Sequence, residues 1–217
     1  MVEQAKYNDY YKQKKVQFEL VKNMKGREVS LLGEGVPVRC IKAHNIGYLN
    51  SNFKAFRFFN TQYNIYSSLA LLNNMPMFSY SPKTRRDQQD KFIIEFENYV
   101  TSYDVAFDFD SHHYTIEKCY NDVDKFCRML TNSDVSFNLK SSGSGFHIGI
   151  FPTTCREEVS GTIDFLKNSI SVLKQVYRLD SLDSSVYDIR RLWKIPYSLD
   201  IRSGNVALPF LNLGKAQ

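Results

Sequence analysis

The segment "DVAFDFD" (residues 104–110) determines how the chain can fold around it, because apolar and acidic residues alternate along its second half. Successive side chains of a β-strand point to opposite faces. The pattern therefore predicts a strand with Asp108 and Asp110 on one face and with Phe107 and Phe109 on the other. The two carboxylates would lie about 7 Å apart, given the rise of a strand per residue.

Two carboxylates in this arrangement suit a hard cation, because Mg²⁺ in proteins is held by one or two carboxylates together with substrate phosphates. The alternative is a pair of solvent-exposed acids at the end of a strand. The Asp-x-Asp pattern alone does not decide between these interpretations. His112 and His113 follow directly, and we interpret them as exposed turn residues.

The sequence after this strand predicts an α+β sheet covered by helices on one face. Apolar residues at spacings of 3 and 4 indicate a helix that begins near Thr115. Two strands joined by a Ser/Gly turn follow at 135–152, and a second helix follows at about 156–177, with its apolar stripe ending at Tyr177. A short strand and a hairpin-like pair close the chain, so the predicted order is strand, helix, strand, strand, helix, strand.

The N-terminal half has a weaker pattern. We expect one domain over residues 1–217, with an N-terminal lobe of about 1–90 and a second lobe of about 91–217. We expect a helix over about 3–25 that stops at Gly26, followed by a strand pair at 27–32 and 36–43 that is joined at Gly33 and Gly35. A helical or mixed stretch is expected at 52–64, and a strand or a helix at 65–72. A loop or helix start at 81–90 and a strand-like stretch at 91–100 complete this half.

Composition limits the classes of protein. With 43% hydrophobic residues the 217-residue chain can bury a substantial core. It has no apolar run of membrane-spanning length and no apolar secretory signal, so we expect an intracellular protein without a membrane partner. The net charge of +5 suits a polyanionic partner. The cysteines do not have the spacing of a zinc site, so we expect reduced, structural thiols and no bound zinc. They are Cys40, Cys119, Cys127 and Cys155.

The turn "KSSGSGFHIGI" (residues 140–150) carries a second set of candidate ligand-binding residues. Its small residues let backbone N–H groups approach an anion, and Ser141 and Ser142 offer hydroxyl groups. His147 begins the apolar strand that follows. Each part also has a structural explanation, since a Gly/Ser hairpin needs no ligand and a single histidine at a strand start is commonly structural.

A third candidate set lies in "LDSSVYDIRRLWK" (residues 182–194), where Asp183 is followed by Arg190, Arg191 and Lys194. These charges are consistent with a surface salt-bridge network. They are equally consistent with cations that hold a triphosphate.

In this order, "FDFD" (107–110), "SSGSGFH" (141–147) and "LD" (182–183) resemble the catalytic core of the archaeo-eukaryotic primase superfamily, the primase-polymerases. The resemblance spans about residues 26–212, and its specific motifs lie in the second half. The chain lacks the zinc-bearing insertion that many relatives carry after the acid pair. It also has Ser144 where relatives often have Lys or Arg, and Asp200 where they often have His.

The resemblance implies an RRM-like antiparallel sheet with helices, an N-terminal α/β lobe, and two-metal nucleotidyl transfer by a DNA primase or template-directed polymerase. Its implied partners are a single-stranded DNA template and nucleoside triphosphates. A helicase or a second primase subunit on another chain is a further candidate partner. Because no Walker motif occurs, a helicase would be a separate chain or would lie outside these 217 residues. The implied ligands of two Mg²⁺ or Mn²⁺ ions are Asp108, Asp110 and Asp183, and the implied nucleotide contacts are Ser141, Ser142, His147, Arg191 and Lys194.

Three alternatives stay open. A glycosyltransferase also uses Asp-x-Asp with a divalent ion, but it does not account for the Ser-Gly-His turn or the later Leu-Asp pair. A two-metal nuclease would use the same acids for hydrolysis at phosphorus. A catalytically idle nucleic-acid-binding subunit of a replication complex is the non-enzymatic alternative.

Overall fold

A computed structural model describes residues 9–33, 38–41, 63–73, 79–80, 96–111, 113–155, 159–184 and 187–210. These residues form a mixed α+β fold with two antiparallel sheets. Its elements are α2 (Lys14–Met24), β1 (Glu28–Gly33), β2 (Val38–Ile41), β3 (Tyr63–Ser68), β4 (Ala70–Leu72), β5 (Ser79–Tyr80), β6 (Val100–Asp110), α5 (Ile116–Asn132), β7 (Phe137–Ser141), β8 (Gly145–Cys155), α6 (Val159–Tyr177) and β9 (Leu192–Lys194).

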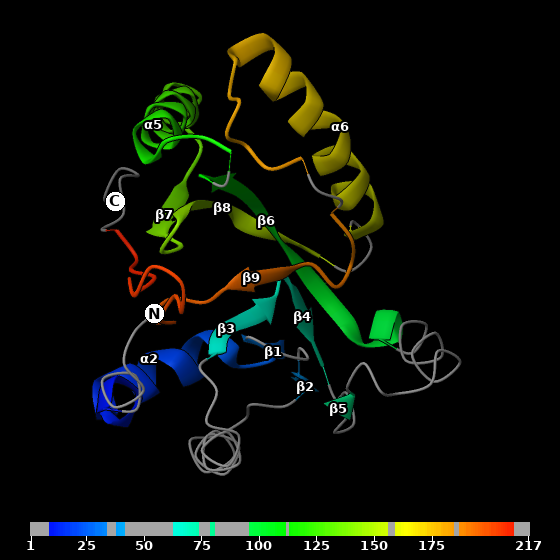
Figure 1. The fold of residues 1–217 in the computed structure, drawn as a ribbon. Helices are drawn as coiled ribbons and strands as arrows, with labels where there is room; N and C mark the ends of the chain where they lie inside the picture. Colours follow the sequence, from blue (N-terminus) through cyan, green and yellow to red (C-terminus); the bar gives the residue numbers. More distant parts are fainter. Residues whose placement is uncertain are drawn as a thin grey trace.

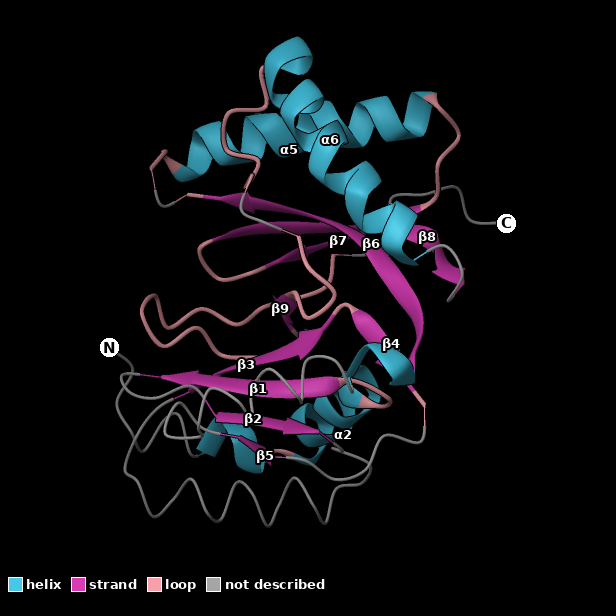
Figure 2. Ribbon diagram, turned by 90° about the vertical axis from the view of Figure 1, so that its right-hand side faces the viewer, coloured by secondary structure: helices cyan, strands magenta, loops and turns pink. Residues whose placement is uncertain are grey.

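The elements stack in layers (Figures 1 and 2). Helices α5 and α6 cover one face of the sheet with strand order β4-β6-β8-β7, which we call the upper sheet. On its other side lies the second sheet, β5-β2-β1-β3-β9, which we call the lower sheet. Helix α2 packs against the lower sheet through Leu20 and Met24. Each sheet therefore has its own apolar core, and the two sheets meet through more polar faces.

The alternation in β6 confirms the predicted strand. Phe107 and Phe109 are buried against α5, where their ring centroids lie 4.8 and 5.6 Å from that of Phe126. Asp108 and Asp110 lie on the opposite, partly exposed face. Burial of each phenylalanine contributes about 1.5–3 kcal/mol relative to an exposed side chain. The two buried phenylalanines therefore fix the orientation of the strand, and with it the face on which Asp108 and Asp110 lie.

The helix predictions are largely confirmed. Helix α5 begins after Thr115, whose side chain accepts a hydrogen bond from the Lys118 N–H. The N-terminal helix ends before Gly26, which has a φ of +73°, but it is interrupted at Gln13, whose backbone is extended. The apolar stripe of α6 was predicted one step too long, because Tyr177, the last residue of the helix, is 48% exposed.

The ambiguous stretch at 65–72 forms strands, in β3 and β4. The strand expected at 91–100 is wrong for residues 96–99, which form a helical turn. Burial of Phe96 and Val100, four residues apart with exposed or half-buried residues between them, fits this turn. The predictions for residues 3–8, 34–37, 42–43, 52–62, 81–95 and 156–158 lie outside the described residues.

The last strand differs from the predicted order. Instead of completing the upper sheet, β9 pairs with β3 in the lower sheet. The edge position beside β6 is filled by β4, which comes from the N-terminal half, and by a single bridge between Phe109 and Leu182. Both sheets are thus built from distant parts of the chain, and the two halves of the sequence are interleaved.

Other predictions concern single side chains. Cys119 and Cys127 are buried free thiols, as expected for structural cysteines, whereas the side chains of the other cysteines lie outside the described residues. His113 is exposed as predicted, and His112 is not described. Among the described helices, none is long and apolar enough to cross a membrane.

Candidate active site

The acid pair faces the lower sheet from the middle of the upper sheet. Strand β6 pairs with β8 so that Asp108 lies opposite His147, and β8 pairs with β7 so that His147 lies opposite Lys140. Residues directly opposite in neighbouring strands project from the same face. The register therefore places Lys140, His147 and Asp108 in one row across the sheet.

The segment after α6 brings the third acid to this row. The Asp183 N–H donates to the Asp108 carbonyl at 2.7 Å, and the Asp110 N–H donates to the Ser181 carbonyl at 2.8 Å. Leu182, which lies between these bonds, is fully buried in the core of the upper sheet. Asp183 therefore lies beside Asp108, and the side chains of both are about one quarter exposed, at 27% and 25%.

A buried aspartate in α5 anchors this segment. The Asp122 carboxylate accepts hydrogen bonds from the Ser181 N–H at 3.0 Å and from the Ser181 hydroxyl at 2.9 Å, and it forms an ion pair with Lys118 at 2.7 Å. Hydrogen bonds to a buried charged group are among the stronger ones in proteins. Sequence reasoning missed Asp122, and its one available signal was an acid within the apolar face of the predicted helix.

Arg191 is the cation of the acid cluster, which we define as Asp108, Asp110 and Asp183. Its guanidinium lies 2.8 Å from an Asp183 carboxylate oxygen and 3.6 Å from one of Asp108. Burial raises the pKa of Asp108, but His147 and Arg191 outweigh burial and hold the pKa below its ordinary value. The Asp108 carboxylate is therefore ionised at neutral pH.

His147 positions the Asp108 carboxylate. Its Nε2 lies 3.2 Å from Asp108 Oδ1, and the imidazole is 4% exposed. Burial lowers the pKa of His147 to about 4, so the ring is neutral at pH 7 and donates its Nε2–H to the carboxylate. Its buried Nδ1 has no hydrogen-bond partner among the described residues.

The donor chemistry of the acid cluster fits Mg²⁺ or Mn²⁺, which prefer carboxylate oxygens. Within the described residues, no three His, Cys, Asp or Glu side chains are already grouped closely enough to hold a metal ion. In this structure Arg191 contacts both Asp183 and Asp108. Metal ligation by both carboxylates would therefore compete with the Arg191 contacts.

The glycines of the Ser/Gly turn are explained by close backbone approaches. A Cβ at Gly145 would lie 2.1 Å from the Phe109 carbonyl oxygen of β6. Gly143 has a φ of +95°, and a Cβ there would lie 2.6 Å from the Cβ of Asp200. The turn thus needs glycine at both positions whether or not it contacts a ligand.

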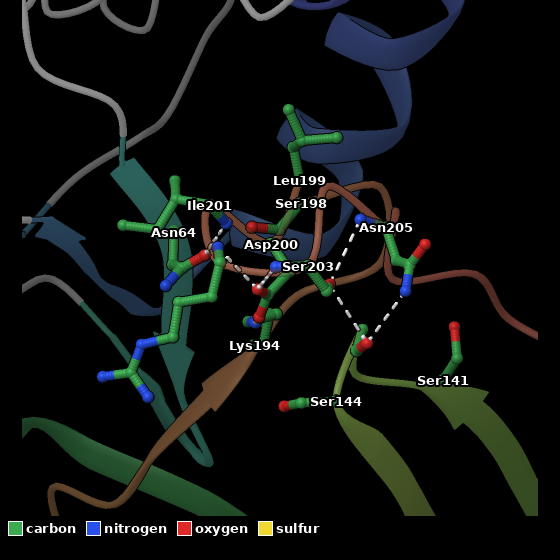
Figure 3. Close-up of polar contacts among 12 residues, drawn as sticks. Asn64, Ser141, Ser144, Lys194, Ser198, Leu199, Asp200, Ile201, Ser203 and Asn205 are labelled. Atoms are coloured by element: carbon green, nitrogen blue, oxygen red, sulfur yellow. Dashed lines mark hydrogen bonds and ion pairs between the residues drawn. The ribbon is translucent and has the colours of Figure 1, made fainter. Parts of the chain in front are cut away.

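The serines of the turn make contacts within the chain. The Ser141 hydroxyl accepts a hydrogen bond from the Leu208 N–H at 3.0 Å and donates to the Val206 carbonyl at 3.3 Å, so it joins the turn to the C-terminal segment. Ser142 is buried, and its N–H donates to the Gly145 carbonyl. Figure 3 shows Ser141 and Ser144 at the hairpin, near the loop that carries Ser203 and Asn205.

Lys194 lies in a separate charge cluster. Its ammonium contacts the Asp200 carboxylate, and both side chains are 5% exposed or less (Figure 3). Asp200 Oδ1 also accepts hydrogen bonds from the N–H groups of Arg202 at 2.9 Å and Ser203 at 3.0 Å. Burial raises the pKa of Asp200, but these partners outweigh burial and lower the pKa overall. The structure therefore brings His147 and Arg191 to the acid cluster but directs Lys194 to Asp200.

Comparison with known proteins adds no family assignment: a scan against protein-family models finds no match for this chain, and a search of curated proteins also finds none.

Proposed function

We propose that the chain is a template-directed nucleotidyltransferase of the primase-polymerase type. The observation that carries this proposal is the pairing of residues 181–183 along β6, which places Asp183 beside Asp108. Two acids from one strand and a third from a distant segment then line one edge of the space between the sheets. A metal-dependent phosphoryl-transfer site needs such a convergence of carboxylates.

In the proposed reaction, a primer 3′-hydroxyl oxygen attacks the α-phosphorus of a nucleoside triphosphate. The new bond joins that oxygen to the α-phosphorus, and the bond between the α-phosphorus and the oxygen that bridges the α- and β-phosphates breaks. Pyrophosphate leaves, and the hydroxyl proton passes to solvent. Asp108, Asp110 and Asp183 would hold two Mg²⁺ or Mn²⁺ ions. Such ions lower the pKa of the attacking hydroxyl and neutralise charge on the leaving group.

The chain's own residues have distinct roles in this proposal. His147 holds the Asp108 carboxylate in one orientation through its Nε2–H. Arg191 stabilises the carboxylates of Asp108 and Asp183 while no nucleotide is bound. A guanidinium donates to phosphate oxygens as readily as to carboxylates, so Arg191 would transfer its contacts to the triphosphate when a nucleotide arrives.

A primer-extension assay tests the proposal. A labelled primer on a single-stranded template is incubated with Mn²⁺ and either all four deoxynucleotides or all four ribonucleotides. Elongated product is the expected result. A shortened strand would support the nuclease alternative, and template binding without any product would support the idle subunit.

Two variants calibrate this assay. Asp108→Asn should lower incorporation by about 1,000-fold or more, since it removes a charged ligand of the reacting centre. Asp124→Asn is the matched control, because Asp124 is a 42% exposed acid of α5 that pairs only with Arg128 in the described ion pairs. Equal incorporation by wild type and Asp108→Asn would overturn the proposal.

A further inference from the structure

A pocket of about 320 Å³ lies between the two sheets. Lys140, which belongs to the same row across the upper sheet as Asp108, is in its wall, whereas none of the three acids of the acid cluster is. It is lined by residues of α2, β3, β6, β7, β8 and β9 together with loop residues. This volume falls at the lower end of the range of about 300–1,000 Å³ found for small-molecule sites.

The pocket wall has more positive than negative side chains. Its cations are Lys22, Arg27 and Lys140, and its one carboxylate among the described residues is Asp104. Asp104 already forms an ion pair with Arg27 at 2.6 Å. Positive charge on the remaining cations is therefore available to an anionic ligand.

Of the pocket's three cations, Lys140 is the one that is enclosed and yet contacts no carboxylate among the described residues, since Lys22 is exposed and Arg27 pairs with Asp104. Three other cations with largely buried side chains contact a carboxylate, as the pairs Arg190–Glu28, Arg191–Asp183 and Lys194–Asp200 show. The Lys140 ammonium donates to the main-chain carbonyl of Lys194, and no described carboxylate forms an ion pair with it. A partly buried ammonium without a counter-charge is unfavourable. Its burial lowers the pKa of Lys140 to about 7.

The rest of the pocket is suited to a flat, largely apolar group. Trp193 lies in the wall, with the Lys140 ammonium 4.4 Å from its ring centroid. The indole Nε1–H of Trp193 is buried and has no hydrogen-bond partner among the described residues. Leu69, Ile195 and Phe210 provide further apolar surface. An anion-binding end next to apolar and aromatic walls matches a ligand that joins a phosphate to a ring system.

We propose that this pocket binds a nucleoside phosphate, with a phosphate group against Lys140 and the base against the apolar wall that includes Trp193. The inference rests on the proposed function for the choice of a nucleotide, whereas the requirement for an anion follows from Lys140 itself. A nucleotide phosphate at Lys140 would be separated from Asp108 by one intervening strand, β8, which places His147 between them in the row across the sheet.

Trp193 supplies a direct readout, because it is the sole tryptophan of the chain. Its emission is followed while adenosine triphosphate or inorganic tripolyphosphate is added to the full chain in metal-free buffer with EDTA, and calorimetry measures the same affinities independently. We expect saturable binding of both probes, with the nucleotide bound more tightly. Tripolyphosphate separates recognition of phosphate from recognition of the base.

Variants at Lys140 test its role. Lys140→Met should weaken binding of both probes by about tenfold or more, the loss expected for a charge-assisted hydrogen bond. Lys140→Arg, which keeps the charge, should retain part of the affinity. Lys167→Met is the matched control, because Lys167 lies on α6 with a side chain that is 44% exposed. Thermal unfolding of Lys140→Met should show no loss of stability, so weaker binding could not be attributed to misfolding.

The outcomes separate this inference from the proposed function. Unchanged affinity in Lys140→Met, or failure of both probes to bind the wild type, overturns the inference even if the chain extends primers. A single-stranded oligonucleotide that changes Trp193 emission at a lower concentration than the nucleotide does also overturns it, in favour of a template-binding groove. Nucleotide binding that depends on Lys140, in a chain that never extends a primer, supports the inference and overturns the polymerase assignment.

Discussion

Two charge clusters, the Lys194–Asp200 pair and the acid cluster, differ in how completely their charges are satisfied. In the Lys194–Asp200 cluster, both side chains are 5% exposed or less, and the carboxylate also accepts two backbone N–H hydrogen bonds. In the acid cluster, the carboxylates of Asp108 and Asp183 are about one quarter exposed and share the guanidinium of Arg191.

This difference separates a structural cluster from a candidate reacting one. A buried, fully satisfied ion pair has no unused acceptor for a ligand, and breaking it leaves a charge without a partner. Partly exposed carboxylates with one shared cation retain acceptor capacity and access to solvent. Resemblance to known motifs placed Lys194 among the nucleotide contacts, whereas its geometry places it with Asp200, on the structural side of the comparison.

The largest stability effect is expected at the Lys194–Asp200 cluster. Asp200→Asn removes the charge that balances buried Lys194 and should lower the free energy of unfolding by about 3–5 kcal/mol, measured by urea denaturation. Asp164→Asn, in an exposed pair with Lys167 at 3.9 Å, is the matched control. Its effect should stay within about 0.5 kcal/mol. Equal effects of the two changes would show that burial does not distinguish these pairs.

A smaller effect is expected where the acid cluster is anchored. Asp122→Asn weakens the hydrogen bonds to Ser181 and removes the charge that faces Lys118, so it should lower the free energy of unfolding by about 2 kcal/mol. Because Ser181 holds the segment that carries Asp183, nucleotide incorporation should fall together with stability. Full activity in a destabilised Asp122→Asn would contradict the role of this anchor in positioning the third acid.

The titration of Lys140 predicts that the free energy of unfolding depends on pH, because the pKa of this group differs between the folded and the unfolded chain. Its pKa is about 7 in the folded chain, below the ordinary value of 10.5. Between these values the unfolded chain binds more protons, so the wild type gains stability as pH rises from 7 towards 10.5. Lys140→Met lacks this group. Its stability relative to the wild type should therefore be highest at pH 6 and should decrease towards pH 10, as measured by chemical denaturation across that range.

The smallest stability effect is expected at the acid cluster itself. Asp108→Asn keeps a hydrogen-bond acceptor for His147 and leaves Arg191 paired with Asp183, so the free energy of unfolding should change by about 1 kcal/mol or less. Denaturation curves of this variant and the wild type should nearly coincide. A loss as large as that of Asp200→Asn would mean that the acid cluster is a structural ion pair.

Local pattern was sufficient to predict β6, the faces of Asp108 and Phe107, and helix α5, since alternation and helical spacing are contained in the sequence of each element. It was insufficient for the placement of β9, which depends on pairing with β3 across a large part of the chain. The Lys194–Asp200 pair, the Asp122 anchor and the unmatched charge of Lys140 are likewise products of tertiary contacts. The helical turn at 96–99 was missed because the surrounding stretch 91–100 is rich in aromatic and β-branched residues, which favour strands.

The most direct test of the central claim, that the acid cluster takes divalent metal ions, is Mn²⁺ binding measured by electron paramagnetic resonance in the presence of a nucleoside triphosphate. The nucleotide's own affinity for Mn²⁺ is subtracted with a protein-free titration. We predict protein-dependent Mn²⁺ binding by the wild type and by Asp124→Asn, and binding weakened about tenfold or more in the folded Asp108→Asn variant. Identical Mn²⁺ binding by Asp108→Asn and the wild type would contradict it.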